Sequence, residues 1–226
     1  VLGVVGESGS GKSVTAYSVM GLTAYPGKLV GGKVWFNGHE IENMKEKDFR
    51  KIRGNEVSII FQDPMTSLNP VFRIGDQLNE VLTLHNEEGL NKEQIKERTI
   101  QLLEMVGIAN SEGVYKNFPH ELSGGMRQRV MIAMALACNP KIIIADEPTG
   151  NIDPALSYEI VDLLSAINER GTTVLMVTHE HSLVKHFHKR IIQIHSGEIV
   201  ADTAAISKEQ QAAAQAVATQ ETVAVD

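Results

Sequence analysis

Short apolar runs recur along this chain and alternate with longer segments of helical character. Five of the runs have the length and composition of buried strands: residues 1–5, 56–61, 141–145, 172–177 and 190–194. Residues 14–22 and 126–137 have the composition of helices. Alternating strands and helices predict a largely parallel sheet that is covered by helices on both faces. The expected fold class is therefore α/β.

Two regions depart from this alternation. Residues 31–41 place the pair Asn37-Gly38 between two candidate strands, which indicates an antiparallel hairpin. The charged residues 42–53 then indicate a surface helix. From about residue 71 the pattern becomes helical, and Ile95, Leu102 and Val106 fall on one apolar stripe. We expect a helical subdomain at about residues 71–139, inserted into the α/β core.

Composition and charge narrow the possible classes of protein. The 226 residues, with a mass of 24.7 kDa, suffice for one large domain. A net charge of -7 argues against a general affinity for nucleic acid, so no nucleic-acid partner is expected. The single cysteine, Cys138, rules out an internal disulfide framework. No run approaches the roughly 20 apolar residues needed to cross a bilayer.

A glycine-rich segment near the start of the chain predicts a phosphate site. Gly6-Glu7-Ser8-Gly9-Ser10-Gly11-Lys12-Ser13 fits the pattern G-x-x-x-x-G-K-[ST] between a predicted strand and a predicted helix. Lys12 is placed to reach the β- and γ-phosphates of a nucleotide, and the Ser13 hydroxyl to ligate Mg²⁺. A glycine-rich turn without a ligand is the disfavoured alternative. The residues expected to bind the nucleotide are Gly6, Ser8, Gly9, Ser10, Gly11, Lys12, Ser13 and Val14.

Asp146 and Glu147 follow the most continuous apolar run, at the sheet edge where open α/β folds bind ligands. Asp146 suits a Mg²⁺-holding role because hard Mg²⁺ prefers oxygen ligands. Glu147 can act as a general base on the attacking water. The alternative is that the two carboxylates merely solvate a strand end. His179 follows another strand at this edge, which favours a role near phosphate over a place in the core.

Ser123-Gly124-Gly125 forms a second candidate anion site. It stands directly before a predicted helix, where backbone N–H groups, a hydroxyl and the helix N-terminus can surround an anion. The first site already holds the phosphates of one ATP. A second site in the same chain therefore suggests that two chains pair head to tail, each closing over the nucleotide of the other.

With these motifs in this order, the chain resembles the ATP-binding subunit of an ABC transporter over about residues 1–202. Residues 122–126 match the signature sequence of that family. The resemblance implies a P-loop NTPase fold with a mostly parallel sheet, an antiparallel β region and an inserted helical subdomain. It also implies Mg²⁺-dependent hydrolysis of ATP, coupled to transport.

The same resemblance assigns roles to individual residues. It implies that Gln62 senses Mg²⁺ and the attacking water, and that Ser13 and Asp146 hold the metal with it. Glu147 matches the catalytic carboxylate and His179 the histidine that contacts the γ-phosphate. Asp153 matches the aspartate of the loop that crosses between subunits, and is expected to contribute to the nucleotide site.

The subfamily changes along the chain. Residues 1–149 resemble ATPases of oligopeptide and dipeptide importers through the glycine-rich segment, residues 61–70 and residues 122–139. Residues 150–202 are similar instead to ATPases of cell-division and lipoprotein-release complexes, notably at Gly150-Asn151-Ile152-Asp153. A natural mosaic, a spliced chain and an unusual family member all remain open.

The resemblance implies a function and a set of partners. The leading function is to energise peptide import through separate membrane subunits; the alternative is a cell-division or lipoprotein-release ATPase acting on a membrane partner. The expected partners are a second ATP-binding subunit, in a homodimer or a heterodimer, and permease subunits that dock on the segment from Asp63 to Ile74. The expected location is the cytoplasmic face of the inner membrane. An ABC-type ATPase that handles DNA or ribosomes, and a chain that binds nucleotide without turnover, are two further alternatives.

The two ends of the chain carry their own expectations. The chain begins without Met, on a strand that rarely comes first in a nucleotide-binding sheet, so we expect further strands upstream of Val1. After Asp202 the composition shifts to Ala, Gln, Thr and Val without aromatics. We expect residues 1–202 to form the ATP-binding domain and residues 203–226 a low-complexity tail.

Overall fold

The computed structural model describes residues 1–41, 44–86, 89–150, 152–186 and 189–204. Its elements are, in chain order, β1 (Leu2–Val5), α1 (Lys12–Val19), β2 (Trp35–Phe36), β3 (His39–Glu40), α2 (Glu46–Ile52), β4 (Val57–Ile60), α3 (Pro64–Ser67), α4 (Ile74–Leu84), α5 (Lys92–Met105), α6 (Ser111–Lys116), η1 (Pro119–Glu121), α7 (Gly124–Leu136), β5 (Ile142–Asp146), α8 (Pro154–Glu169), β6 (Thr173–Thr178), α9 (His181–His186), β7 (Arg190–His195) and β8 (Glu198–Asp202). The predicted tail lies outside the described residues from residue 205 onward.

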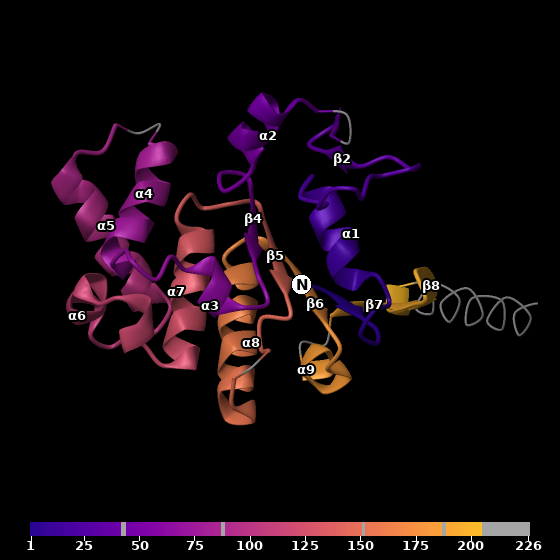
Figure 1. Ribbon diagram of the computed structural model, residues 1–226. Helices are drawn as coiled ribbons and strands as arrows, with labels where there is room; N and C mark the ends of the chain where they lie inside the picture. Colours follow the sequence, from indigo (N-terminus) through magenta and orange to yellow (C-terminus); the bar gives the residue numbers. More distant parts are fainter. Residues whose placement is uncertain (42–43, 87–88, 151, 187–188, 205–226) are drawn as a thin grey trace, which may run out of the picture.

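The central sheet confirms the predicted α/β class. Its six strands lie in the order β4-β5-β6-β1-β7-β8, and every neighbouring pair is parallel except β7 and β8 (Figure 1). All five predicted strands are present. β8 was not predicted, because three of its five residues are exposed and its alternation of apolar and polar positions is weak.

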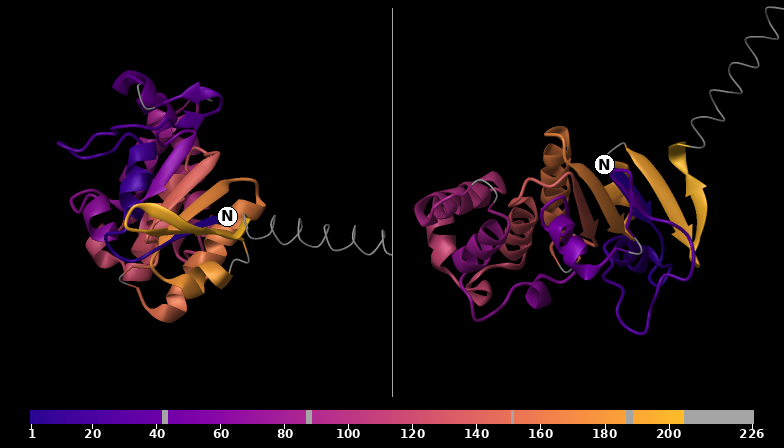
Figure 2. Two further views of the ribbon diagram at one scale, coloured as in Figure 1. Left: turned by 90° about the vertical axis from the view of Figure 1, so that its right-hand side faces the viewer. Right: turned by 90° about the horizontal axis from the view of Figure 1, so that it is seen from above.

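Both faces of the sheet are covered. Val5, Ile143 and Met176 belong to the larger apolar core, which includes residues of α7 and α8. Their chain neighbours Val4, Ile144 and Val177 belong to a smaller core on the other face, with Ala16 and Met20 at α1. Successive strand side chains point to opposite faces, and Figure 2 shows helices on either side of the sheet. This double burial explains the continuous apolar runs of the sequence.

The helices α4 to α7 gather beside the β4 end of the sheet (Figures 1 and 2). The predicted stripe of Ile95, Leu102 and Val106 is buried in the larger core. This helical lobe follows the β4 strand in sequence and returns to the sheet through α7 and β5. Within the described residues, no helix combines the length and the apolar character that crossing a lipid bilayer requires.

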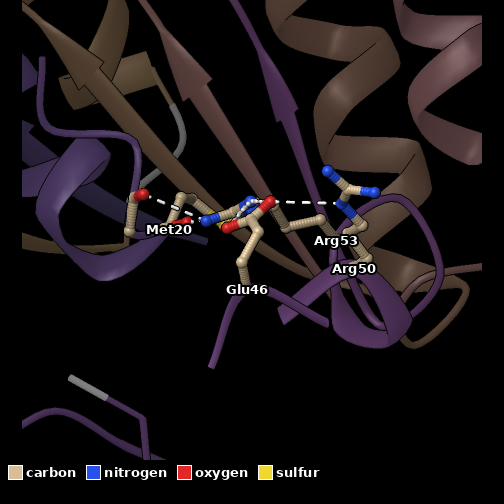
Figure 3. Close-up of polar contacts among 5 residues, drawn as sticks. Met20, Glu46, Arg50 and Arg53 are labelled. Atoms are coloured by element: carbon tan, nitrogen blue, oxygen red, sulfur yellow. Dashed lines mark hydrogen bonds and ion pairs between the residues drawn. The ribbon is translucent and has the colours of Figure 1, made fainter. Parts of the chain in front are cut away.

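The predicted hairpin is confirmed: β2 and β3 pair antiparallel around Asn37 and Gly38. Both turn residues have positive φ, at 48° and 78°, as the tight hairpin turns of Asn-Gly pairs require. The helix α2 follows, and the residue after it, Arg53, reaches back to the end of α1 (Figure 3). Arg53 donates from Nε to the Met20 carbonyl at 2.8 Å and from a terminal guanidinium nitrogen to the Gly21 carbonyl at 3.0 Å. A cation therefore caps the C-terminus of the helix that begins at the glycine-rich segment.

Candidate functional site

The glycine-rich segment, residues 6–13, joins β1 to α1 at the carboxyl edge of the sheet. Gly9 and Gly11 have φ values of 80° and 97°, in the left-handed region that glycine adopts without strain. Gly6 is required for a steric reason, because an added Cβ would stand 2.2 Å from the Ile194 carbonyl oxygen. The segment thus wraps closely around the start of α1, where backbone N–H groups favour an anion.

Lys12 places its charge inside this loop. Its side chain is buried, and Nζ donates hydrogen bonds of 2.8 Å to the carbonyl oxygens of both Gly6 and Glu7. These contacts fix the ammonium group beside the loop at the N-terminal end of α1. An anion in the loop would meet both the helix N-terminus and this cation.

Ser13 links the glycine-rich segment to Asp146. Its hydroxyl donates a 2.7 Å hydrogen bond to Oδ1 of Asp146, which ends β5 and is fully buried. The other carboxylate oxygen, Oδ2, has no hydrogen-bond partner among the described residues. Burial, and secondarily the nearby Asp146 carboxylate, raise the pKa of Tyr17 to about 12.

Glu147 and His179 form a pair at the same edge. Oε2 of Glu147 lies 2.6 Å from Nδ1 of His179, and the Glu147 side chain is almost buried while that of His179 is 56% exposed. Glu147 has a φ of 49°, unusual for a residue other than glycine. Its backbone N–H donates to the Val177 carbonyl at 2.8 Å, which holds the turned backbone against β6. The carboxylate is therefore fixed toward the imidazole.

Gln62 lies near Gly150, the third residue after Glu147. It follows β4, and its Cγ is 3.7 Å from the position that a Cβ on Gly150 would occupy. Gly150 in turn donates from its backbone N–H to the Glu147 carbonyl at 2.9 Å. The structure thus brings Gln62, Asp146, Glu147 and His179 to one edge with the glycine-rich segment.

Ser123, Gly124, Gly125 and Asp153 form a second group. Ser123 caps α7 by accepting a hydrogen bond from the Met126 N–H at 3.3 Å. Gly125 is buried, and an added Cβ would stand 3.1 Å from Leu156 of α8. Asp153 caps α8 in the same way. α7 belongs to the lobe beside β4, whereas the glycine-rich segment follows β1, which two strands, β5 and β6, separate from β4. Asn151, quoted in the resemblance, lies outside the described residues.

Two contributors to the site were missed from the sequence. The turn between β7 and β8 braces the glycine-rich segment, because the Gly197 N–H donates to the Ser10 carbonyl at 3.0 Å. The Ser-Gly pair at residues 196–197 was the available signal, and both residues have positive φ. Tyr17 is the other, and nothing in its spacing from Asp146 indicated their contact.

The residues present fit a nucleotide phosphate with Mg²⁺. The Ser13 hydroxyl and the unpartnered Oδ2 of Asp146 are oxygen ligands, which Mg²⁺ prefers. The described residues contain no group of three or more His, Cys, Asp or Glu side chains that could hold a metal by themselves. A magnesium ion here would share its coordination with water and phosphate oxygens, the usual arrangement for this ion.

Comparisons with known proteins agree with this geometry. The family model described as ABC transporter matches residues 1–150. The chain is 46% identical over 199 residues to the oligopeptide transport ATP-binding protein AppD of Bacillus subtilis, covering 87% of this chain and 60% of AppD. It is 45% identical over 201 residues to the dipeptide transport ATP-binding protein DppD of Escherichia coli, covering 88% of this chain and 61% of DppD.

The oligopeptide transport ATP-binding protein OppD of Salmonella typhimurium is 47% identical over 197 residues, covering 87% of this chain and 58% of OppD. The chain thus spans about three fifths of the length of these relatives. Aligned lengths of 197 to 201 residues carry the similarity beyond Thr149, where the sequence suggested a change of subfamily.

Solved structures match as well. A dimeric structure of the ATP-binding cassette MJ0796 in a post-hydrolysis state, bound to ADP and Pi, superimposes with a TM-score of 0.79 at 31% identity, covering 89% of this chain and 83% of that chain. A second dimeric structure of MJ0796, titled a bacterial ABC transporter cassette, gives a TM-score of 0.78 over the same shares.

Proposed function

We propose, from the premise that this chain belongs to the ABC transporter family, that it is an ATP-hydrolysing subunit that powers peptide import through separate membrane subunits. The observation that carries the proposal is the Ser13–Asp146 hydrogen bond of 2.7 Å, which joins the glycine-rich segment and the carboxylate pair into one phosphate site. The peptide substrate rests on the three relatives, which are oligopeptide and dipeptide transport proteins.

Hydrolysis would follow from the positions of five side chains. Lys12 and the loop N–H groups bind the β- and γ-phosphates, while Ser13 and Asp146 hold Mg²⁺. The magnesium ion supplies charge neutralisation at the phosphate oxygens when it is bound. Glu147 accepts the proton of a water whose oxygen attacks the γ-phosphorus, and the bond to the ADP oxygen breaks. His179, 2.6 Å from Glu147, orients that carboxylate, and it would contact the γ-phosphate of a bound nucleotide.

The second group of residues completes the site from another chain. Ser123, Gly124 and Gly125 offer N–H groups at the start of α7, away from the glycine-rich segment of their own chain. A head-to-tail pair would bring this cradle, and Asp153, against the nucleotide held by the partner. The dimeric MJ0796 structures support pairing of this kind. The partner is a second copy or a related ATP-binding subunit.

The membrane subunits would dock on the segment from Asp63 to Ile74. Met65, Val71 and Phe72 of this segment are 58%, 73% and 53% exposed, an unusual density of large apolar side chains. The segment borders an apolar groove of about 230 Å³ that Leu68 and Met131 help to line. An amphipathic helix of a permease at the cytoplasmic face of the membrane would fit such a surface.

Reconstitution with peptide-permease membrane subunits in vesicles tests the proposal. We expect ATP-dependent peptide uptake, and we expect Phe72→Ser combined with Met65→Ser to abolish assembly while nucleotide binding persists. Ile199→Ser is the matched control, because Ile199 is 67% exposed on β8, away from the segment. If the wild-type chain hydrolyses ATP and assembles but moves no peptide, the peptide assignment is wrong. The next test would use the membrane subunits of cell-division or lipoprotein-release complexes, which residues 150–153 suggest.

A further inference from the structure

A cavity of about 570 Å³ lies between the helical lobe and the core, apart from the phosphate site. The end of α4 and one face of α5 form its lobe side; Asn55, before β4, and the turn after α7 form its core side. Figure 1 shows α4 and α5 standing together beside the sheet. The volume lies within the range of small-molecule sites.

Two opposite charges line this cavity. Glu97 and Arg98 are neighbours on α5; Arg98 is half-buried and Glu97 is exposed at the rim. In the part of the chain that the structure describes, neither side chain has a hydrogen-bond or ion-pair partner. Among the described residues of the lining, they are the only acidic side chain and the only guanidinium. One carboxylate and one guanidinium match a ligand that carries one ammonium and one carboxylate group.

Neutral polar groups complete the lining. Asn55, Gln101 and Asn139 bring carboxamides from three different elements, and no other described residue hydrogen-bonds their side chains. A carboxamide both donates and accepts, as a peptide group does. His85, Asn86 and Gln94 also line the cavity, and the apolar side chains of Leu82 and Ala137 leave room for a small aliphatic group.

We propose that this cavity binds a small zwitterion of the amino-acid class, a free amino acid or a dipeptide. Its carboxylate pairs with Arg98, its ammonium group with Glu97, and its peptide group, where it has one, with the carboxamides. A nucleotide is a poorer match, because its phosphates would face a single guanidinium and a carboxylate. The proposal concerns binding and needs no membrane subunit.

Binding there would act on the lobe. The occupant would connect α5 to the segments before β4 and after α7, and so restrain the lobe that carries Ser123 relative to the core that carries Lys12. If the proposed function in peptide import is correct, the imported product would slow further ATP hydrolysis. This regulatory meaning rests on the proposed function, whereas the binding itself does not.

Isothermal titration of the chain with alanyl-alanine, and separately with alanine, tests the proposal. We expect saturable binding of at least one of them; alanine binding as tightly as the dipeptide would identify a single amino acid as the ligand. N-acetyl-alanyl-alanine and alanyl-alanine amide each lack one charge. We expect each blocked form to bind about tenfold more weakly or worse than alanyl-alanine, since a charge-assisted hydrogen bond is worth about 1.5–3 kcal/mol.

Substitutions on α5 provide a second test of the binding proposal. We expect Arg98→Ala and Glu97→Gln to lose binding, and Arg98→Lys to keep part of it. Glu93→Gln and Lys92→Ala are the controls, because both residues are exposed on the first turn of α5 and neither lines the cavity. Absence of saturable binding of both probes to the wild-type chain would overturn the proposal, as would equal binding of the blocked forms. Neither result would bear on reconstituted peptide transport, which tests the proposed function separately.

Discussion

Nδ1 of His179 lies 2.6 Å from Oε2 of Glu147, although 32 positions separate the two residues in the chain. The sheet brings them together: β5 and β6 are adjacent and parallel, with Asp146 opposite Val177, so the residues that follow each strand emerge side by side. Since β6 also pairs with β1, the glycine-rich segment emerges next to them. Strand order, rather than spacing in the sequence, assembles the candidate catalytic pair.

Glu147→Gln removes the carboxylate that we expect to accept a proton from water. Because general-base catalysis typically contributes about 10²–10⁴-fold, we expect the rate of ATP hydrolysis to fall by about that factor. Nucleotide binding should persist, since Lys12 and Ser13 are unchanged. Steady-state hydrolysis and ATP titration measure the two effects. Glu169→Gln, at the exposed end of α8, is the control. An unchanged rate of hydrolysis in Glu147→Gln would show that Glu147 is not the general base.

Gly6→Ala tests the close packing around the glycine-rich segment. The added Cβ would stand 2.2 Å from the Ile194 carbonyl oxygen and 2.7 Å from the Ser10 hydroxyl oxygen, so the backbone must shift. We expect a loss of about 1–3 kcal/mol in the free energy of unfolding, together with weaker nucleotide binding. Urea denaturation and ATP titration measure these. Gly31→Ala, where a Cβ meets nothing within 4 Å, should leave both unchanged; equal effects of the two substitutions would refute the packing argument.

Arg53→Ala tests the cap on α1. Arg53 bonds the Met20 and Gly21 carbonyls and also pairs with Glu46. Among the described residues Arg50 pairs with Glu46 alone, and its side chain is 77% exposed (Figure 3). We expect Arg53→Ala to lower the free energy of unfolding by about 1–2 kcal/mol, because charged hydrogen bonds to two helix-end carbonyls are lost. Arg50→Ala should cost less than about 0.5 kcal/mol, as exposed ion pairs do. Denaturation at neutral pH measures the free energy of unfolding of both variants. Similar losses in the two would show that the two carbonyl contacts contribute little.

Tyr17→Phe tests the raised pKa of this phenol, which comes first from burial and then from Asp146. Burial and the aspartate raise the pKa of Tyr17 in the folded chain to about 12, from an ordinary value of 10.0. The folded state therefore holds this proton more tightly; its contribution to stability is complete below pH 10 and declines between pH 10 and 12. We expect Tyr17→Phe to make the alkaline loss of stability shallower over that interval. Urea midpoints at several pH values measure it.

Tyr25→Phe is the control for this pH series, because Tyr25 is 98% exposed. It should follow the wild-type curve. A Tyr17→Phe curve that also follows the wild type would mean that neither burial nor Asp146 raises the pKa of Tyr17 in solution.

Much of this fold could be predicted from the sequence because its signals are local. Strands buried on both faces give unbroken apolar runs such as residues 142–145, and the Asn37-Gly38 pair fixes its turn through positive φ. The positions of the glycine-rich segment and of Asp146 could also be predicted, since each lies at the end of such a strand. Their roles as ligands of nucleotide and metal stay predictions.

Other features depend on contacts that no short stretch of sequence encodes. The Ser-Gly pair at residues 196–197 signals a turn, but the hydrogen bond from Gly197 to Ser10 joins segments far apart in the chain and could not be predicted from either one. β8 is largely exposed, so its apolar signal is weak. The cavity beside Arg98 arises from the placement of the lobe against the core, which requires the packed structure.

In the proposed dimer, each ATP site combines the glycine-rich segment of one chain with residues 123–125 of another. Lys12→Ala disables the first element and Gly124→Asp the second, where the nearest atom to a new Cβ is 3.8 Å away and the added carboxylate would repel phosphate. A head-to-tail pair formed from the two variants keeps one intact site. We predict that each variant alone is inactive and that their mixture hydrolyses ATP. A mixture as inactive as its components, under conditions in which the wild-type chain hydrolyses ATP, would contradict the shared site.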